Sequence, residues 1–322
     1  MPKRFLRILL APLLAAGLFA ARGGAAPPAA LPASPLAVHV LDVGHGDAIV
    51  ILTPGGRCVL IDAGGGRRGG GAVLSLLKEK RVRRLDTVVM SHADSDHIGG
   101  MPAVLSSGIE VGEFLDPGYP HTTTLYRRVL EAVQARPETR YRTPRAGELL
   151  DWGKELRVRV LAPGDDPRGT NDSSIVIRLT YGTVSFLFTG DAGRRSEREM
   201  ARRFGTGLRA QVLKAGHHGS KSSSTAPFLK LVKPEVAIVS TRGAGPDDPY
   251  RETTARLRAA GSKIYQTGRY GMVTVYSDGA GYRVVTEREV EPAEAEVRET
   301  AAATGAAAPP RELPASTAAV AH

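Results

Sequence analysis

Cysteine is almost absent from this chain of 322 residues, since Cys58 is the only one. A single cysteine excludes an internal disulfide and a zinc site built from several cysteines. Cys58 lies within the largely apolar run 57–61, where we interpret it as a small buried residue rather than a nucleophile. Any metal site must therefore use histidine and carboxylate side chains.

Aromatic residues are also scarce, at 5% of the chain, although hydrophobic residues as a whole make up 42%. A sizeable core is therefore possible, but it must consist mainly of Val, Leu, Ile and Ala. Beyond the N-terminal segment the sequence has no apolar run long enough to span a membrane. We expect the mature protein to be soluble.

The charge is unbalanced, with 43 Lys and Arg against 33 Asp and Glu and a formal net charge of +10. Such a balance favours polyanionic partners or an anionic surface. The alternative is that arginine simply occupies solvated faces, because the positive charges do not form one block. Both interpretations stay open at this point.

The N-terminal residues have the layout of a targeting segment. Lys3, Arg4 and Arg7 precede the apolar stretch 8–20, and small residues follow it. This pattern predicts a signal peptide over residues 1–26 and an exported protein, either periplasmic or secreted. The alternative is an uncleaved N-terminal anchor, which is the only membrane association that the sequence suggests.

One globular domain is predicted over residues 36–288. The Ala- and Pro-rich residues 27–35 are predicted to be a linker, and residues 289–322, which contain almost no large apolar side chains, a disordered tail. Short strand-like runs joined by turns dominate the first part of the domain, and strands alternate with helical patterns later. This order predicts an α+β fold of layered sheets flanked by helices, and not a TIM barrel.

The densest group of potential metal ligands is the loop His92-Ala93-Asp94-Ser95-Asp96-His97. It follows the predicted buried strand 87–90 and precedes a helix that opens at Ile98-Gly99-Gly100. Alternate residues of an extended segment point the same way, so His92, Asp94 and Asp96 are expected to face one pocket. His97 is expected to turn toward a second position.

Two more predicted strands end in potential ligands. Strand 184–189 leads to Asp191, and strand 211–214 leads to His217 and His218. Taken alone, Asp191 is equally well explained as a helix cap, and the histidine pair as part of a surface loop. Because strand ends gather at one edge of a sheet, we expect all three segments to meet in a shared cleft.

These segments resemble the metallo-β-lactamase superfamily. Together with residues 39–48, Leu60-Ile61-Asp62-Ala63-Gly64 and Asn171-Asp172-Ser173-Ser174, they resemble the hydrolase domain of ComEC-type DNA-uptake (competence) proteins, over residues 37–277. The resemblance implies an αβ/βα four-layer sandwich, with two mixed sheets flanked by helices. It does not include the family's membrane channel or nucleic-acid-binding module, so uptake through a pore is not predicted.

The resemblance implies a site for two divalent metal ions, either Zn²⁺ or Mn²⁺. One ion would be held by His92 and Asp94. The other would be held by Asp96 and His97, with His217 favoured over His218 as the further histidine ligand. Asp191 would bridge both ions. Two carboxylates, Asp62 and Asp47, would orient the ligands through hydrogen bonds.

Further roles are predicted beside the metals. The predicted catalytic residues are Asp96, His218 and His45, of which a protonated His218 or His45 would donate a proton to the leaving group. The predicted substrate contacts are Asn171, Ser220 and Lys221. The alternatives are an Asx-turn for Asn171 and a solvated loop for Ser220 and Lys221.

The sequence also departs from the family's usual pattern. His45 stands where relatives usually have Gln, so it is either an added polar group near the site or a turn residue. Many relatives have a Gly-His-Pro segment before their last long helix, whereas this chain has Asp247-Asp248-Pro249-Tyr250. One late contact to metal or substrate is therefore missing.

The predicted function is that of a metal-dependent phosphodiesterase or nuclease acting on DNA or a related phosphodiester. Two neighbouring divalent cations activate water and neutralise charge on the substrate oxygens. The alternatives are hydrolysis of another exported substrate, namely a phosphorylcholine ester or a β-lactam, and a non-catalytic protein that binds nucleic acid. Asp94 argues against a β-lactamase, which keeps a histidine there. No obligate protein partner is inferred.

Overall fold

The computed structural model describes residues 35–242 and 249–290. The chain divides into a unit of residues 1–30 and a unit of residues 31–322, and all described residues belong to the second. The predicted signal peptide, all of the predicted linker except Pro35 and most of the predicted tail lie outside the described residues. Within the described residues, no helix combines the length and the apolarity needed to cross a membrane.

The first sheet has eight strands in the order β15-β14-β1-β2-β3-β4-β5-β6. Strands β3 to β6 run parallel to one another, whereas the remaining neighbours are antiparallel, so this sheet is mixed. Its strands are β1 (Leu36–Val40), β2 (Ala48–Leu52), β3 (Cys58–Ala63), β4 (Arg84–Val89), β5 (Glu110–Leu115), β6 (Arg140–Arg142), β14 (Val273–Ser277) and β15 (Tyr282–Thr286).

The second sheet has seven strands in the order β13-β12-β11-β10-β9-β8-β7 and is also mixed, with β10 to β13 parallel and β7 to β10 antiparallel. Its strands are β7 (Leu149–Leu150), β8 (Leu156–Ala162), β9 (Val176–Tyr181), β10 (Val184–Phe188), β11 (Val212–Lys214), β12 (Val236–Val239) and β13 (Lys263–Gln266).

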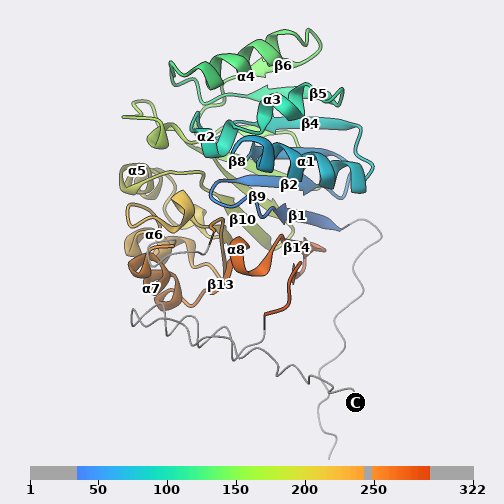
Figure 1. Ribbon diagram of the computed structural model, residues 1–322. Helices are drawn as coiled ribbons and strands as arrows, with labels where there is room; N and C mark the ends of the chain where they lie inside the picture. Colours follow the sequence, from blue (N-terminus) through green and yellow to red (C-terminus); the bar gives the residue numbers. More distant parts are fainter. Residues whose placement is uncertain (1–34, 243–248, 291–322) are drawn as a thin grey trace, which may run out of the picture. The chain divides into compact units, whose positions relative to one another are not determined.

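Helices cover the outer face of each sheet (Figure 1). The first sheet is covered by α1 (Gly66–Glu79), α2 (Ser95–Ile98), α3 (Met101–Leu105) and α4 (Thr124–Gln134), and the second by α5 (Arg194–Phe204), α6 (Ala226–Val232) and α7 (Arg251–Ala259). A short helix, α8 (Thr267–Tyr270), joins β13 to β14. The 3₁₀ turns are η1 (Asn171–Ser173), η2 (Gly205–Leu208) and η3 (Gly216–Gly219).

Three apolar cores separate the layers, and alternation along the strands decides which side chain enters which core. In β1, Leu36, Val38 and Val40 belong to the core between the sheets, so His39 points to the outer, helical side. The structure is therefore a four-layer sandwich of two mixed sheets flanked by helices, as predicted.

Parallel pairing of the strands determines where the candidate metal ligands lie. Strands β3, β4 and β5 all end at one edge of the first sheet, and β10, β11 and β12 end together in the second. Asp62 lies near the end of β3, and the segments that follow β4, β10 and β11 contain the ligand loop, Asp191 and the histidine pair. The segments that were expected to meet at the strand ends therefore come from both sheets.

Helix α1 begins at Gly66 and buries Val73, Leu76 and Leu77 of its second half. Its glycine-rich first half has low helix propensity, but close packing requires it. A Cβ on Gly69 would lie 2.1 Å from the carbonyl oxygen of Ala63. Strands β6 and β7 and helices α2 and α8 are only two to four residues long, too short for a hydrophobic period to predict them.

Candidate metal centre

The ligand loop follows β4 and turns directly into α2. Its two histidines, His92 and His97, are fully buried, whereas the side chains of Asp94 and Asp96 are 38% and 30% exposed. Asp94 adopts extended backbone at the N-cap of α2, and Asp96 and His97 lie inside that helix. The change from extended to helical backbone therefore directs His92 and Asp94 to one place, and Asp96 and His97 to another.

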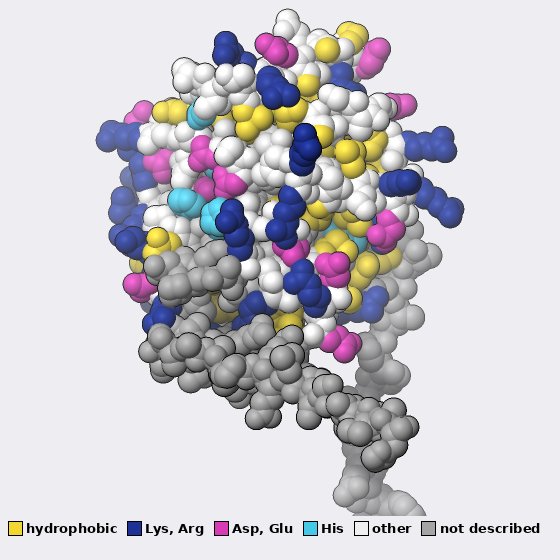
Figure 2. Space-filling view, in the orientation of Figure 1, with side chains coloured by type: hydrophobic (Ala, Val, Ile, Leu, Met, Phe, Trp, Pro, Cys, Tyr) yellow, Lys and Arg dark blue, Asp and Glu magenta, His cyan; other side chains and the backbone are white. Residues whose placement is uncertain are grey.

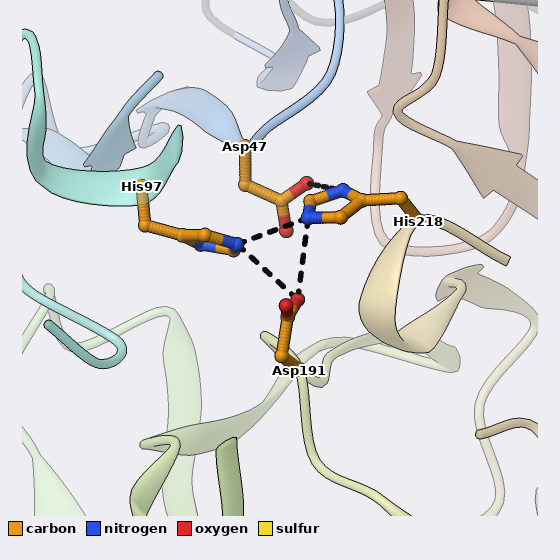
Figure 3. Close-up of side chains that lie close together, drawn as sticks. All are labelled: Asp47, His97, Asp191 and His218. Carbon is orange, nitrogen blue, oxygen red and sulfur yellow. Dashed lines mark hydrogen bonds and ion pairs between the residues drawn. The ribbon is translucent and has the colours of Figure 1, made fainter. Parts of the chain in front are cut away.

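The carboxylate of Asp191 lies between two pairs of imidazoles. Its Oδ2 lies 3.6 Å from Nε2 of His92 and 3.6 Å from Nε2 of His217. Its Oδ1 lies 3.2 Å from Nε2 of His97 and 3.5 Å from Nε2 of His218 (Figure 3). One buried carboxylate thus faces two separate groups of ligands with its two oxygens.

Each group also contains an aspartate of the ligand loop. Asp94 Oδ2 lies 3.4 Å from His92 Nε2, and Asp96 Oδ2 lies 3.1 Å from His218 Nε2. We call the seven residues the ligand cluster. Its first group is His92, Asp94 and His217, its second group is Asp96, His97 and His218, and Asp191 is shared.

The histidine pair is arranged differently from the sequence interpretation, which placed His217 with Asp96 and His97. Both histidines lie in η3 with left-handed backbone, at φ values of 49° and 52°. Two successive left-handed residues turn the side chains apart, so that His218 reaches the second group and His217 the first. Such backbone costs about 1–3 kcal/mol per residue and is typical of functional sites. Sequence spacing contains no information about this turn.

The hydrogen bonds of the buried imidazoles leave their Nε2 lone pairs free. The Ser91 hydroxyl lies 2.6 Å from Asp62 Oδ2 and donates to it, so it accepts from His92 Nδ1, which lies 3.0 Å away. His97 Nδ1 lies 2.7 Å from the same carboxylate, which can only accept. In the neutral form of each ring, the form that binds a metal, Nε2 therefore faces the cluster without a proton.

Several cluster atoms lack protein partners. His92 Nε2 and Asp191 Oδ1 are buried and have no hydrogen-bond partner. His97 Nε2 and His218 Nε2 face each other at 3.1 Å. Buried polar atoms left in this way are costly unless something binds them. Imidazole nitrogens and carboxylate oxygens suit divalent cations. Asp47, His97, Asp191 and His218 each bring one such atom to within 4.8 Å of the others, and so do His45, Asp96 and His218.

Asp62 fixes the ligand loop from beneath. Its Oδ1 accepts from the backbone N–H of Ser91 at 2.8 Å, in addition to the bonds from Ser91 Oγ and His97 Nδ1. Asp62 is fully buried at the end of β3 and has a positive φ of 56°. The position predicted for it, hydrogen-bonded behind a ligand, is where the structure has it.

Asp47 lies behind His218 in the same way. Its Oδ1 is 3.4 Å from His218 Nδ1 (Figure 3). The same atom is 2.9 Å from Nζ of Lys214, and all three side chains are buried. Lys214 also donates to the carbonyl of Ala215 at 2.8 Å. Sequence reasoning did not identify Lys214 as a site residue. The available signal was a lysine inside an otherwise apolar strand.

The charges of the cluster favour cations. Burial raises the pKa of Asp191, but His97 and His218 outweigh it and hold that pKa well below its ordinary value. Burial lowers the pKa of His97, but Asp191 and Asp62 raise it well above its ordinary value. For His218, burial is likewise outweighed by Asp191, Asp47 and Asp96, and the pKa rises to about 9. The carboxylates thus stabilise positive charge among the imidazoles.

Gly46 lets the 42–47 loop approach the ligand loop. It has a φ of +125°, and a Cβ there would lie 2.1 Å from the carbonyl oxygen of Asp96. Neither the backbone angle nor the space suits another residue. This contact brings both Asp47 and His45 to the cluster.

The remaining predicted residues lie around the cluster. The His45 ring lies 4.4 Å from the His218 ring, and the His45 side chain is 42% exposed. Asn171 Nδ2 lies 3.4 Å from His217 Nδ1. Ser220 Oγ contacts Ser222 Oγ within its own loop, and the Lys221 ammonium lies over the Tyr250 ring. Asn171 therefore contacts a ligand. The Ser220 hydroxyl reaches His217 through Ser222, whose Oγ lies 3.3 Å from His217 Nδ1, whereas the ring contact of Lys221 is with Tyr250.

A cavity of about 400 Å³ opens beside the ligand loop. It is lined by Asp94 and Asp96 on one side and by His121 and Thr123 of the segment before α4 on the other. His121 Nδ1 lies 3.0 Å from the Thr123 hydroxyl. Sequence reasoning missed both residues, because their segment has no motif and reaches the ligand loop only through the tertiary fold.

Comparisons with known proteins agree with this geometry. The family model described as the metallo-beta-lactamase superfamily matches residues 41–243. The chain is 30% identical over 257 residues to ComE operon protein 3 of Bacillus subtilis, covering 73% of this chain and 32% of that protein. It is 32% identical over 246 residues to competence protein ComA of Neisseria gonorrhoeae, covering 76% and 33%. The chain thus spans about a third of the length of these relatives.

A solved structure is similar in fold. A variant of CmlA, a β-hydroxylase of Streptomyces venezuelae, superposes with a TM-score of 0.50 at 15% identity, over 77% of this chain and 55% of that one. At this identity the likeness concerns the fold alone. The family match over residues 41–243 and the relatives at 30–32% identity lead to one conclusion: the chain belongs to the metallo-β-lactamase superfamily, most of whose members are metal-dependent hydrolases.

Proposed function

We propose that this protein is an exported two-metal phosphodiesterase that hydrolyses DNA or a related phosphodiester. The observation behind the proposal is the buried Asp191 carboxylate, whose two oxygens face two separate groups of ligands. The similarity to competence protein ComA, together with the resemblance to DNA-uptake proteins, favours DNA as the substrate class. Since the chain matches only a third of those proteins, the substrate is part of the proposal.

The residues suit Zn²⁺ or Mn²⁺. Four imidazole nitrogens favour zinc, while the carboxylates of Asp94, Asp96 and Asp191 also suit a harder ion. When bound, such a pair of ions activates water and neutralises charge on the phosphate. The chain itself contributes the fixed imidazole tautomers, through Asp62 and Asp47, and the cavity in which a phosphodiester would be placed.

Proton transfer to the leaving group is assigned to His45 rather than to His218. His218 is enclosed, because its Nε2 faces Asp96 and Asp191 while its Nδ1 faces Asp47. His45 lies at the mouth of the cluster and is partly exposed, so a leaving group can reach it. In Figure 2, Lys and Arg side chains surround the area where His and acidic side chains gather, which favours an anionic substrate.

The test is hydrolysis of bis-p-nitrophenyl phosphate and of single-stranded and duplex DNA by the full chain with Mn²⁺ or Zn²⁺. His92→Ala and Asp96→Ala should each lower the rate by roughly 100-fold or more, because bound metals supply several kcal/mol of transition-state stabilisation. Glu131→Gln, on the exposed face of α4, is the matched control and should leave the rate unchanged. Cleavage that survives both ligand substitutions would refute the proposal.

The same preparations separate the rival substrates. Nitrocefin tests a β-lactam, and p-nitrophenyl phosphorylcholine tests a phosphorylcholine ester. We expect little turnover of nitrocefin, because Asp94 replaces the histidine of β-lactamases in the first group. Faster metal-dependent turnover of either compound than of the phosphodiesters would favour that substrate instead.

Export is proposed from the basic start and apolar stretch of residues 3–20. Fractionation of cells that express the full chain should place the protein outside the cytoplasm. Replacing Leu9 and Leu10 by Arg should retain it inside, because charges in the apolar stretch block recognition as a signal. Equal distribution of both proteins would contradict export by this segment.

A further inference from the structure

A second cavity lies at the opposite end of the first sheet from the ligand cluster. It has a volume of about 670 Å³, within the usual range of about 300–1,000 Å³ for small-molecule sites. Its walls come from the start of β1, the turn between β2 and β3, the end of α1 with the segment leading to β4, and Tyr276 of β14. Because β3 and β4 begin there and end at the cluster, the two sites are separated by the length of a strand. We call it the far cavity.

Positive charge dominates the rim of the far cavity. Five basic residues line it against one carboxylate, Asp86; they are Arg57, Lys80, Arg81, Arg83 and Arg84. Three of the five have acidic partners, since Arg57 pairs with Asp151, Lys80 with Glu79, and Arg84 with Asp86 and Glu110.

Arg81 and Arg83 are different. Both are exposed, and neither side chain makes a recorded hydrogen bond or ion pair within residues 35–242 and 249–290. In Figure 2, Lys and Arg side chains project at the side of the molecule where Figure 1 shows the loop between α1 and β4. Two uncommitted guanidinium groups beside further cations are suited to a phosphate, which they can bind through paired N–H groups.

The far cavity also contains a buried polar atom without a partner. His39 lines the cavity and is 1% exposed. Its Nδ1 lies 2.9 Å from the hydroxyl of Thr274, but its Nε2 has no hydrogen-bond partner. Leaving such an atom unpaired costs about 1–3 kcal/mol. A ligand atom at this position would remove the cost.

The remaining walls are apolar or aromatic. Leu52, Cys58 and Val82 line the cavity, and the ring of Tyr276 meets the His39 ring edge-on at 6.2 Å. A bare inorganic anion would leave these surfaces unused. A ligand that combines a phosphate with a flat, weakly polar part would use both the rim and the walls.

We propose that the far cavity binds a nucleoside monophosphate, with its phosphate on Arg81 and Arg83 and its base against Tyr276 and Leu52. His39 Nε2 makes a hydrogen bond to the ligand and thereby gains the partner that it lacks. The site is independent of the metal centre, because no residue of the ligand cluster lines it. It therefore stands or falls separately from the proposed phosphodiesterase activity.

His39 provides a reporter that the metal centre does not disturb. The chain has 8 histidines, and ¹H–¹³C spectra of the full chain labelled at histidine resolve their Cε1–H signals. His39→Gln identifies the His39 signal, and His39→Asn is the second choice if the first does not fold. We expect AMP to shift this signal to saturation, with a Kd at least tenfold lower than that of inorganic phosphate.

The double variant Arg81→Glu/Arg83→Glu should abolish the shift. The control Arg128→Glu/Arg202→Glu makes the same change of net charge at exposed sites on α4 and α5, and should respond to AMP like the wild type. The proposal is overturned if AMP leaves the His39 signal in place or if the double variant still responds. It is equally overturned if inorganic phosphate binds as tightly as AMP.

Discussion

Replacement of Asp62 by Asn tests whether the carboxylate beneath the ligand loop controls metal binding. Asn tolerates the positive φ of 56° at this position and keeps one oxygen for the backbone N–H of Ser91. Its amide group would stand where Oδ2 now accepts from Ser91 Oγ at 2.6 Å and from His97 Nδ1 at 2.7 Å. An amide N–H cannot accept a hydrogen bond from either group.

His97 would then lose the acceptor that keeps its proton on Nδ1. The proton moves to Nε2, the atom that faces Asp191 and Asp96, and a protonated Nε2 cannot bind a metal. Loss of such a supporting hydrogen bond typically lowers metal affinity by about 10–100-fold, or about 1.4–2.7 kcal/mol. We expect this loss in the second group of the ligand cluster, because the Nδ1 of His92 still has its Ser91 partner.

The assay is competition for Zn²⁺ against a chromophoric chelator, with metal content measured independently after dialysis. Two stoichiometric sites are expected for the wild type, and one weakened site for Asp62→Asn. Asp86→Asn is the control, since Asp86 also accepts a backbone N–H, that of Cys58 at 2.9 Å, but lies far from the cluster. If folded Asp62→Asn binds both ions within twofold of the wild type, the assigned role of Asp62 is refuted.

Four further predictions concern stability. Lys214→Met should lower the free energy of unfolding by about 3 kcal/mol in urea titrations, because it leaves a buried carboxylate without its cation; an effect below 1 kcal/mol would contradict the pairing. Gly46→Ala should lower the melting temperature and the metal affinity, since its Cβ would collide with the carbonyl of Asp96. Gly56→Ala is the control and should affect stability alone, because Gly56 also has a positive φ, of +81°, but nothing lies within 4 Å of the added Cβ. Burial and the charge of Lys80 lower the pKa of His39 from 6.5 to about 4, so stability that is fully present above pH 6.5 should be lost as the pH falls. Relative to His39→Gln, the wild type should lose about 3 kcal/mol of unfolding free energy by pH 4. Parallel pH profiles of the two proteins would contradict this. Removal of metal with EDTA should lower stability by about 4 kcal/mol if the free ion had been at 1,000 times its Kd, and readdition should restore it; an unchanged melting temperature would mean that the cluster binds no ion.

Site residues that could be predicted from the sequence differ from the others in one physical respect, which is whether they follow a recognisable strand. The ligand loop, Asp191 and the histidine pair were found from the sequence because each follows a run of apolar residues that predicts a strand. Parallel strands share an edge, so their meeting was also predictable. By contrast, His121 and Thr123 have no motif, and they reach the ligand loop only because α4 packs over the first sheet.

Supporting interactions were predictable only in part. Asp62 was identified behind the ligands through the family resemblance, and it lies there. Lys214 was not, because a lysine in an apolar strand has no assigned partner until the loop that contains Asp47 is placed beside it. The far cavity was invisible for the same reason, since its walls come from four segments that are distant in the chain.

The sequence by itself therefore determined which residues stand at the ends of strands. It also determined that only histidine and carboxylate side chains are available as ligands. Only the tertiary structure decided which group of the ligand cluster each of these side chains joins. Left-handed backbone at His217 and His218 sends one ring to each group, and the two oxygens of Asp191 face one group each. The physical reason is that backbone angles in a short turn depend on the contacts that enclose it, which neither composition nor spacing records.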